Sequence, residues 1–291
     1  MGNLIIQLLV NGIIAGSSYA LAGVSWGIIY KTTRIFHFSH HLVFTIAGYA
    51  AVLITTKAQL HYSFGFAAAV ISAILAGCSI EVFLYRKLRS LGATQATTFL
   101  ASMGLATVGV TIILLIFSSN PRPLRGFPLA MLAIGPANCT NVDVLAVVSS
   151  WVTIGLLLLF LFKSKYGKAV RAVSSNKEMA ETVGLDVGKI YLLVFGIGSA
   201  LFGIASFLFA AKNVAFPFMG LHPFFIAFTA VFLGGVKSIG GAALAGLLLG
   251  LAENIGMIVL PGEYRSMIAY AILVVVIIFK PEGLLGGRRR D

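Results

Sequence analysis

The chain has 291 residues, of which 59% are hydrophobic and 10% are charged, and its formal net charge is +12. A soluble globular domain carries about 25% charged residues, so this chain has too few charges to cover a surface that faces water. Its basic residues lie between long apolar runs, as they do in the cytoplasmic loops of membrane proteins, which argues against nucleic-acid binding. Composition therefore predicts an all-α polytopic membrane protein, with residues 1–291 forming a single transmembrane domain.

Nine apolar segments approach the roughly 20 residues that a helix needs to cross a bilayer. In chain order they are Leu4–Tyr30, Phe36–Thr56, Tyr62–Tyr85, Ala93–Phe117, Val142–Phe162, Ile190–Ala211, Pro223–Val236, Ile239–Leu260 and Arg265–Phe279. Basic residues are enriched on the cytoplasmic side of a membrane. Nine crossings with the N-terminus outside satisfy this rule for Lys31 and Arg34, for residues 86–89 and 163–189, and for Arg288–Arg290. We expect a bundle of about 8–10 helices.

Glycines mark two features of these segments. Pro223–Val236 is short for a complete crossing, contains one Gly-Gly pair at 234–235 and is followed by another at 240–241, so we expect a broken helix near residues 223–241. Elsewhere small residues recur four apart, a spacing that allows close packing of helices. These pairs are Gly12 and Gly16, Gly23 and Gly27, Ser199 and Gly203, and Gly246 and Gly250.

The most polar part of the chain is the segment 163–189, which we interpret as a cytoplasmic loop that contains a short helix. Ser175 and Glu178 fit a capping box, in which each side chain satisfies a free backbone donor at the start of a helix. Met179, Ala180 and Val183 would follow as a short apolar face. Gly184 suits the C-terminal cap. A capped amphipathic helix outside the bilayer is typical of a docking element.

Few polar side chains interrupt the apolar segments. His37, His40 and His41 have the H-x-x-H-H spacing of membrane di-iron enzymes, yet five histidines in all are too few for the several histidine boxes of that class. We interpret residues 37–41 as a polar joint that lines a pathway. Glu253 would be costly in lipid, so it should face protein or water, either as a packing hydrogen bond or as a contact in the pathway.

The motifs of common enzymes and cofactor sites are absent from the sequence. It contains no Walker A sequence, nucleophile elbow, zinc-binding helix or pair of catalytic carboxylates, so we expect neither an enzyme nor a cofactor or metal site. Nine acidic residues also leave little material for proton or sodium coupling. If the chain moves a solute uphill, the energy should come from a partner, and residues 163–189 are the natural docking point.

Four stretches, spread from end to end, resemble the permease subunits of bacterial branched-chain amino acid ABC importers, the Liv type. They are Asn11–Leu21, which resembles N-G-x-x-x-G-x-x-Y-A-L; Tyr166–Val173 with Asn176–Ala180 and Val183–Val187; Phe232–Ala242 with Gly246–Glu253; and Phe279–Gly286, which resembles F-x-P-x-G-L-x-G.

This resemblance implies a translocation path for a small polar solute in the bacterial inner membrane, with residues 163–189 and the C-terminus in the cytoplasm. The implied partners are two ATP-binding subunits, a second permease that is similar or identical, a periplasmic solute-binding protein and membrane lipid. The expected ATPase-coupling residues are Gly167, Arg171, Asn176, Glu178, Met179, Ala180, Val183 and Gly184. The expected pathway residues are Tyr19, Phe38, His40, Gly234, Gly235 and Glu253.

One stretch departs from the family pattern. Where the family commonly has N-F-A-H-G and an acidic residue, only Phe38 and His40 of residues 37–42 keep the pattern. The cargo therefore stays open between branched-chain or other amino acids and, as an alternative, urea or short amides. An ATP-independent channel or a secondary transporter is a further alternative.

Overall fold

The computed structural model describes all residues except 1, 260, 262–263, 281 and 285–291. The described chain forms two compact units, each assembled from separated stretches. The first unit comprises Met1–Gly27, Pro128–Ile154 and Phe225–Asp291, and the second comprises Ile28–Phe127 and Gly155–Phe224. The basic tail Arg288–Arg290 lies outside the described residues, as do Pro281, Leu285 and Gly286 of the C-terminal motif.

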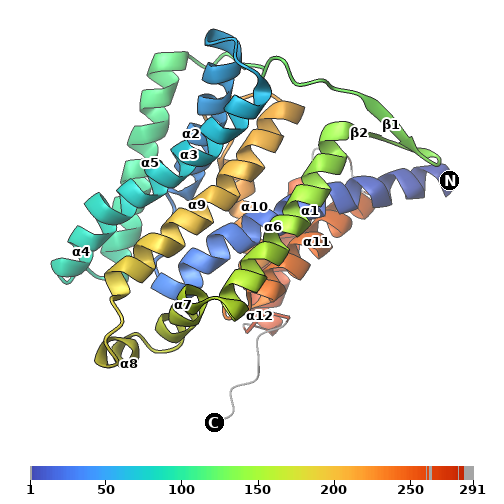
Figure 1. Ribbon diagram of the computed structural model, residues 1–291. Helices are drawn as coiled ribbons and strands as arrows, with labels where there is room; N and C mark the ends of the chain where they lie inside the picture. Colours follow the sequence, from blue (N-terminus) through green and yellow to red (C-terminus); the bar gives the residue numbers. More distant parts are fainter. Residues whose placement is uncertain (1, 260, 262–263, 281, 285–291) are drawn as a thin grey trace. The chain divides into compact units, whose positions relative to one another are not determined.

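Helices dominate both units (Figure 1). The α-helices are α1 (Gly2–Thr33), α2 (His40–Val52), α3 (Tyr62–Ile80), α4 (Arg86–Ser90), α5 (Gln95–Phe117), α6 (Asn141–Lys163), α7 (Lys165–Ser175), α8 (Lys177–Thr182), α9 (Val187–Lys212), α10 (Leu221–Gly234), α11 (Ile239–Gly256) and α12 (Arg265–Phe279). Two π-helical turns, η1 (Leu53–Lys57) and η2 (Glu81–Tyr85), continue α2 and α3.

Within the described residues each of the nine predicted apolar segments is largely helical, and the all-α prediction is confirmed. Six helical stretches of the described chain are long and apolar enough to cross a membrane. They are Gly2–Thr33, Tyr62–Ser90, Gln95–Phe117, Asn141–Lys163, Val187–Lys212 and Ile239–Gly256. The other three predicted segments correspond to α2 with η1, to α10 and to α12. The chain is therefore a multi-pass membrane protein.

In the second unit, α9 packs against α2 and α3 (Figure 1). The predicted small-residue pair on α9 lies at this contact. A Cβ atom placed on Gly203 would lie 2.8 Å from the Cβ of Ala73, and Ser199 lies against Gly77. The helix backbones approach closely because these residues are small, as the sequence predicted.

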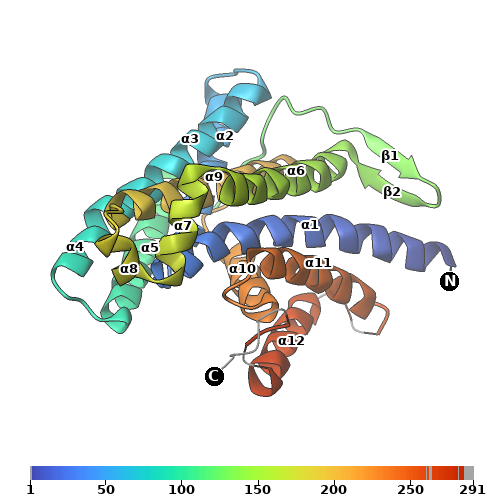
Figure 2. The same cartoon turned by 60° about the horizontal axis from the view of Figure 1, so that its bottom comes forward.

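In the first unit, the two glycine pairs of α1 and α11 face each other. A Cβ on Gly16 would lie 2.7 Å from the Leu247 carbonyl oxygen, and one on Gly250 would meet the backbone of Gly16. The packing of the two backbones leaves no room for a side chain at these positions. Figure 2 shows α11 with α12 beside it, and both contribute to an apolar core with α10.

A β-hairpin in the first unit was not predicted. Strand β1 (Met131–Ile134) pairs antiparallel with β2 (Ala137–Thr140), with Met131 opposite Thr140. Gly135, at φ +60°, allows the tight turn. The Gln7 side chain of α1 holds β2, because it accepts from the Asn138 amide at 2.8 Å and donates to the Asn138 carbonyl at 2.9 Å.

The short helix α10 matches the expectation for residues 223–241. Its 14 residues rise about 21 Å, less than the roughly 30 Å of a bilayer core. Gly235, at φ +95°, turns the chain, and the Ser238 side chain caps α11 by accepting from the Gly241 amide at 2.9 Å. The C-terminal motif returns to this turn, where the Leu284 amide donates to the Leu233 carbonyl at 2.7 Å.

Candidate coupling surface and pathway residues

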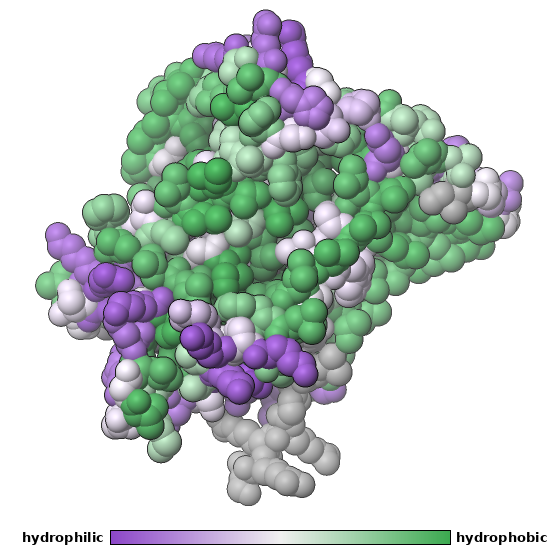
Figure 3. Space-filling model, in the orientation of Figure 1, coloured by the Kyte–Doolittle hydropathy of each residue, from purple (hydrophilic) through white to green (hydrophobic). Residues whose placement is uncertain are grey.

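Basic side chains from three separate loops gather at one end of the second unit. Lys31 lies within electrostatic reach of Arg34 and Arg171. A Cβ on Gly188 would lie 3.9 Å from a guanidinium nitrogen of Arg86. Figure 3 shows hydrophilic residues in the region of α4, α7 and α8, next to a broad apolar surface. The loops that the sequence assigned to one side of the membrane thus meet at one end of this unit.

A buried ion pair supports this basic end. Arg89 of α4 pairs with Glu81, whose side chain is fully buried in η2, and the Arg89 guanidinium lies 4.8 Å from the centre of the Tyr191 ring. Because an unpaired charge would be costly there, the pair fixes α4 against the start of α9. We did not predict this role, although Glu81 beside a basic cluster is a signal that could have indicated it.

Residues 163–189 form two helices rather than one. Ser164 caps α7 by accepting from the Gly167 amide at 2.8 Å. Gly167 is buried, and a Cβ there would lie 2.7 Å from the Leu161 carbonyl oxygen, so α7 can turn sharply away from α6 only with glycine at this position. The Arg171 guanidinium lies 5.0 Å from the centre of the Phe162 ring, a second contact that holds α7 against the end of α6.

The predicted capping box is wrong. Ser175 is the last residue of α7, and Asn176, with extended φ and ψ of −150° and 107°, ends α7 and begins α8. The Asn176 side chain accepts from the Met179 amide at 3.0 Å and is the N-cap. Ser175 cannot serve, because its backbone is still helical where an N-cap must be extended.

The end of α8 matches the prediction for Gly184. Its φ of +84° lies in the left-handed region, which glycine adopts without strain. The Gly184 amide donates to the Glu181 carbonyl and the Leu185 amide to the Ala180 carbonyl, both at 3.0 Å. This pair of bonds is a Schellman motif. The short helix is therefore capped at both ends.

The expected contact face of α8 is only partly exposed. Met179 and Val183, four residues apart, expose 64% and 71% of their surface, and Glu178 is also exposed. Ala180 is 3% exposed, so we correct its assignment: it anchors α8 to the rest of the unit. The surface left for a partner is one pair of apolar side chains among charged residues.

A capped turn leads from α8 into α9. The Asp186 carboxylate accepts from the Lys189 amide at 3.0 Å and pairs with the Lys189 ammonium at 3.1 Å. These hydrogen bonds hold the pKa of Asp186 below its usual value, and the bond from the Lys189 amide has the largest effect. The carboxylate thus stays charged at neutral pH, and its negative charge interacts favourably with the positive N-terminal end of the α9 dipole.

Two of the expected pathway residues contact each other in the first unit. The Tyr19 hydroxyl of α1 donates to a carboxylate oxygen of Glu253 on α11 at 2.8 Å, and Glu253 is fully buried. The pair lies where the glycine faces of α1 and α11 meet, because a Cβ on Gly246 would meet the backbone of Ala20. Spacing alone could not have shown this pairing across 234 residues.

Phe38, in the interruption between α1 and α2, and His40, the first residue of α2, both belong to the second unit. The His40 ring stacks on Phe202 with centroids 4.1 Å apart, and Phe38 packs edge-on against Phe224 at 5.1 Å. The neighbouring His37 makes a 2.7 Å hydrogen bond with the Tyr85 hydroxyl. Residues 37–41 are therefore a buried joint within the helices of this unit.

The sequence did not indicate the polar partners of this joint. Tyr85 donates to the Ser102 hydroxyl at 2.6 Å, and the Ser39 amide donates to the same oxygen at 2.9 Å. Ser102 is a polar residue within the apolar segment of α5, which is the signal that could have identified it. Together Tyr85 and Ser102 supply hydrogen-bond partners for the polar groups of His37 and Ser39, in the segment between α1 and α2.

Gly234 ends α10 and, with Gly235, lies beside the N-terminal end of α11, whereas Glu253 lies near the C-terminal end of α11. Ile239 and Glu253 are 14 positions apart on α11, which corresponds to a rise of about 21 Å. The expected pathway residues of the first unit therefore fall into two places along α11, and do not form a single cluster.

Comparison with known proteins identifies the family. Residues 8–277 match the model of the branched-chain amino acid transport system/permease component family. The chain belongs to this permease family. It is 31% identical to the high-affinity branched-chain amino acid transport system permease protein BraD of Pseudomonas aeruginosa, over 97% of this chain and 95% of BraD. It is 28% identical to the permease protein LivH of Escherichia coli K12, with the same two coverages.

A solved structure supports the fold. The permease resembles PsaBC from Streptococcus pneumoniae, solved in complex with Fab, with a TM-score of 0.53 over 95% of this chain and 93% of that one. The two are 13% identical, so the likeness concerns the fold alone.

Proposed function

We propose that this permease imports branched-chain amino acids, powered by separate ATP-binding subunits and supplied by a periplasmic solute-binding protein. Full-length similarity to BraD and LivH supports the cargo, since both are described as branched-chain amino acid permeases. Urea or a short amide is the alternative cargo, because residues 37–42 depart from the family pattern. The whole chain acts as one permease domain in the inner membrane.

The single observation that carries the coupling role is the exposed Met179–Val183 pair on a helix that is capped at both ends. Capping and the buried Ala180 make α8 a rigid projection, so a force applied to its exposed face is passed to α7 and α9. Apolar side chains surrounded by charges suit a groove on a soluble partner. ATP binding would close the two ATP-binding subunits and move this projection.

The proposed assembly has two permeases, similar or identical, each docking one ATP-binding subunit through residues 163–189. The basic end of the second unit lies in the cytoplasm, as the positive-inside rule requires, and the C-terminus is cytoplasmic as well. Tyr19, Glu253 and the joint around Phe38 and His40 are the proposed elements of the solute path. The turn at Gly234 and Gly235 stays a proposed element of the path, at its cytoplasmic end in this topology.

The test is ATP-dependent uptake into vesicles that contain the permease with its co-expressed partners. A labelled panel of leucine, valine, polar amino acids, urea and acetamide identifies the cargo. We expect uptake of leucine and valine that requires both ATP and the binding protein. Uptake that ignores ATP, or that favours urea, would contradict the proposal.

Met179→Asp tests the coupling surface. The charge should disrupt an apolar contact while leaving insertion into the membrane intact, since the side chain is 64% exposed. We expect at least tenfold slower uptake at equal expression, with ATP hydrolysis no longer stimulated by loaded binding protein. Met179→Leu, which keeps the position apolar, should retain uptake. Normal uptake by Met179→Asp would show that partners dock elsewhere.

A further inference from the structure

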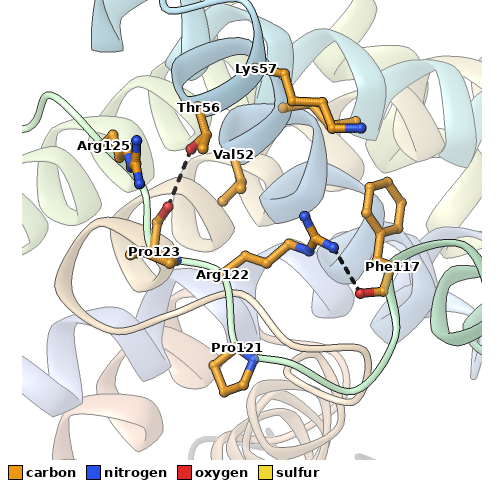
Figure 4. Close-up of a pocket in the computed structure, with 9 residues that line it drawn as sticks. Val52, Thr56, Lys57, Phe117, Pro121, Arg122, Pro123 and Arg125 are labelled. Carbon is orange, nitrogen blue, oxygen red and sulfur yellow. Dashed lines mark hydrogen bonds between the residues drawn. The ribbon is translucent and has the colours of Figure 1, made fainter.

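A small pocket opens in the second unit, where η1 meets the chain that follows α5 (Figure 4). Its volume is about 150 Å³. A cavity of this volume holds a molecule about the size of benzene. The lining residues are Val52, Leu53, Thr56, Lys57, Phe117, Pro121, Arg122, Pro123 and Arg125. The size suits a small solute rather than the chains of a lipid.

The pocket lies at the end of the second unit that is remote from the coupling surface. The 19 residues of α3 and the 5 of η2 run between Lys57 and the basic helix α4, a rise of about 36 Å. This is enough to cross a bilayer core. Under the proposed function, the pocket therefore faces the side from which the solute arrives.

The chemistry of the lining is amphipathic. Lys57, Arg122 and Arg125 supply three cations, and none of the nine lining residues is acidic. Val52, Leu53, Phe117 and the two prolines supply an apolar wall. A carboxylate attached to an apolar side chain matches both parts, whereas an uncharged polar solute lacks the negative charge that three cations favour.

Arg122 is held in place within this pocket. Its backbone exchanges two 2.9 Å hydrogen bonds with Ala215, and its Nη2 donates to the Phe117 carbonyl at 3.0 Å. Figure 4 shows its side chain extending toward Phe117 among the lining residues. Arginine held in this way presents fixed donors to an oxyanion.

Two buried polar groups beside the pocket call for a partner. Within the described part of the chain, neither the Nε of Arg122 nor the hydroxyl of Tyr49 makes a hydrogen bond. Tyr49 is 2% exposed, and its ring lies 4.6 Å from that of Phe117. Buried donors without partners are rare, and an absent ligand is one of their ordinary explanations. The pocket lining includes Leu53, Thr56 and Lys57 of η1, and π-helical turns occur frequently at functional sites.

We propose that this pocket binds the carboxylate of the transported amino acid, with its apolar side chain against Val52, Leu53 and Phe117. The inference rests on the proposed function and goes beyond it, because it names an entry site and the group recognised there. Arg122 is the central residue, with Lys57 and Arg125 at the rim.

The test measures equilibrium binding of labelled leucine to the purified complex with its ATP-binding subunits in nanodiscs. Leucinamide, which keeps the side chain and the ammonium group but lacks the carboxylate, is the matched ligand. We expect leucine to bind at least tenfold more tightly than leucinamide. Arg122→Gln should weaken leucine binding about tenfold or more, as loss of a charged hydrogen bond predicts. Lys212→Gln, which removes a cation outside the lining, should leave binding unchanged.

Arg122 also supports the loop, so its variant could fail to fold. The double variant Lys57→Gln/Arg125→Gln changes only exposed side chains and should still weaken leucine binding several-fold. Equal binding of leucine and leucinamide, or normal leucine binding by this variant, would overturn the proposal. Arg122-dependent binding of phosphatidylglycerol that leucine does not displace would assign the pocket to a lipid phosphate and would also overturn it.

Uptake measured in parallel separates the two proposals. ATP-dependent leucine uptake that is normal in both pocket variants would reject the entry site and keep the importer. Absence of amino acid uptake in the wild-type complex would reject the proposed cargo, whatever the binding result.

Discussion

Replacing Asn176 by alanine tests whether α8 depends on its observed N-cap. The substitution removes the acceptor of the 3.0 Å hydrogen bond from the Met179 amide and leaves that donor without a helical partner. Loss of an N-cap costs typically about 1 kcal/mol. Because α8 has six residues, this cost is large relative to what so short a helix gains by itself.

A local loss of about 1 kcal/mol raises the open population of α8 about fivefold. Amide hydrogen exchange of residues 177–183 in the intact complex measures this opening directly. We expect about fivefold faster exchange there for Asn176→Ala, with α9 unchanged, and a comparable loss of transport coupling. Ser175→Ala is the control: its side chain is exposed and does not cap the helix, so exchange should match that of the wild type. Faster exchange in the Ser175 variant than in the Asn176 variant would refute the assignment.

Two further predictions concern the first unit. Gly250→Leu should destabilise the permease by about 3 kcal/mol, the upper end of overpacking costs, because the new side chain would meet the backbone of Gly16. Thermal unfolding in detergent should show a lower midpoint for this variant. Gly240→Ala is the control, because Gly240 lies on the same helix with open space around it, and its unfolding midpoint should not change. Tyr19→Phe should lower stability by about 1 kcal/mol through loss of its hydrogen bond to Glu253, and an unchanged unfolding midpoint would show that the bond contributes little.

Local patterns predicted the helices well, because crossing a bilayer requires a long apolar run that the sequence shows directly. The same holds for the glycine pairs, since small residues four apart on one face of a helix favour close packing against another helix in lipid. The end of α8 was also predictable, because the left-handed backbone at Gly184 favours glycine.

The sequence alone could not show which of two neighbouring residues of similar capping ability serves as the N-cap of α8. Ser175 and Asn176 are both good N-caps, and packing decides between them: buried Val170 and Val173 keep α7 helical through Ser175. The pocket was missed for another reason. Lys57, Arg122 and Arg125 each look like an ordinary loop cation, and only the fold brings residues from two sides of α3 together.

The glycine contact between α1 and α11 has a consequence for biogenesis. Helix α1 receives its partner α11 only after more than 200 further residues have been made. Until then the glycine face of α1 that packs against α11 lacks its helical partner. The second unit needs nothing beyond Phe224 and can be complete before α11 is inserted. Assembly would thus run from the middle of the chain outward, and truncation before α11 should leave α1 the least protected part of the nascent permease.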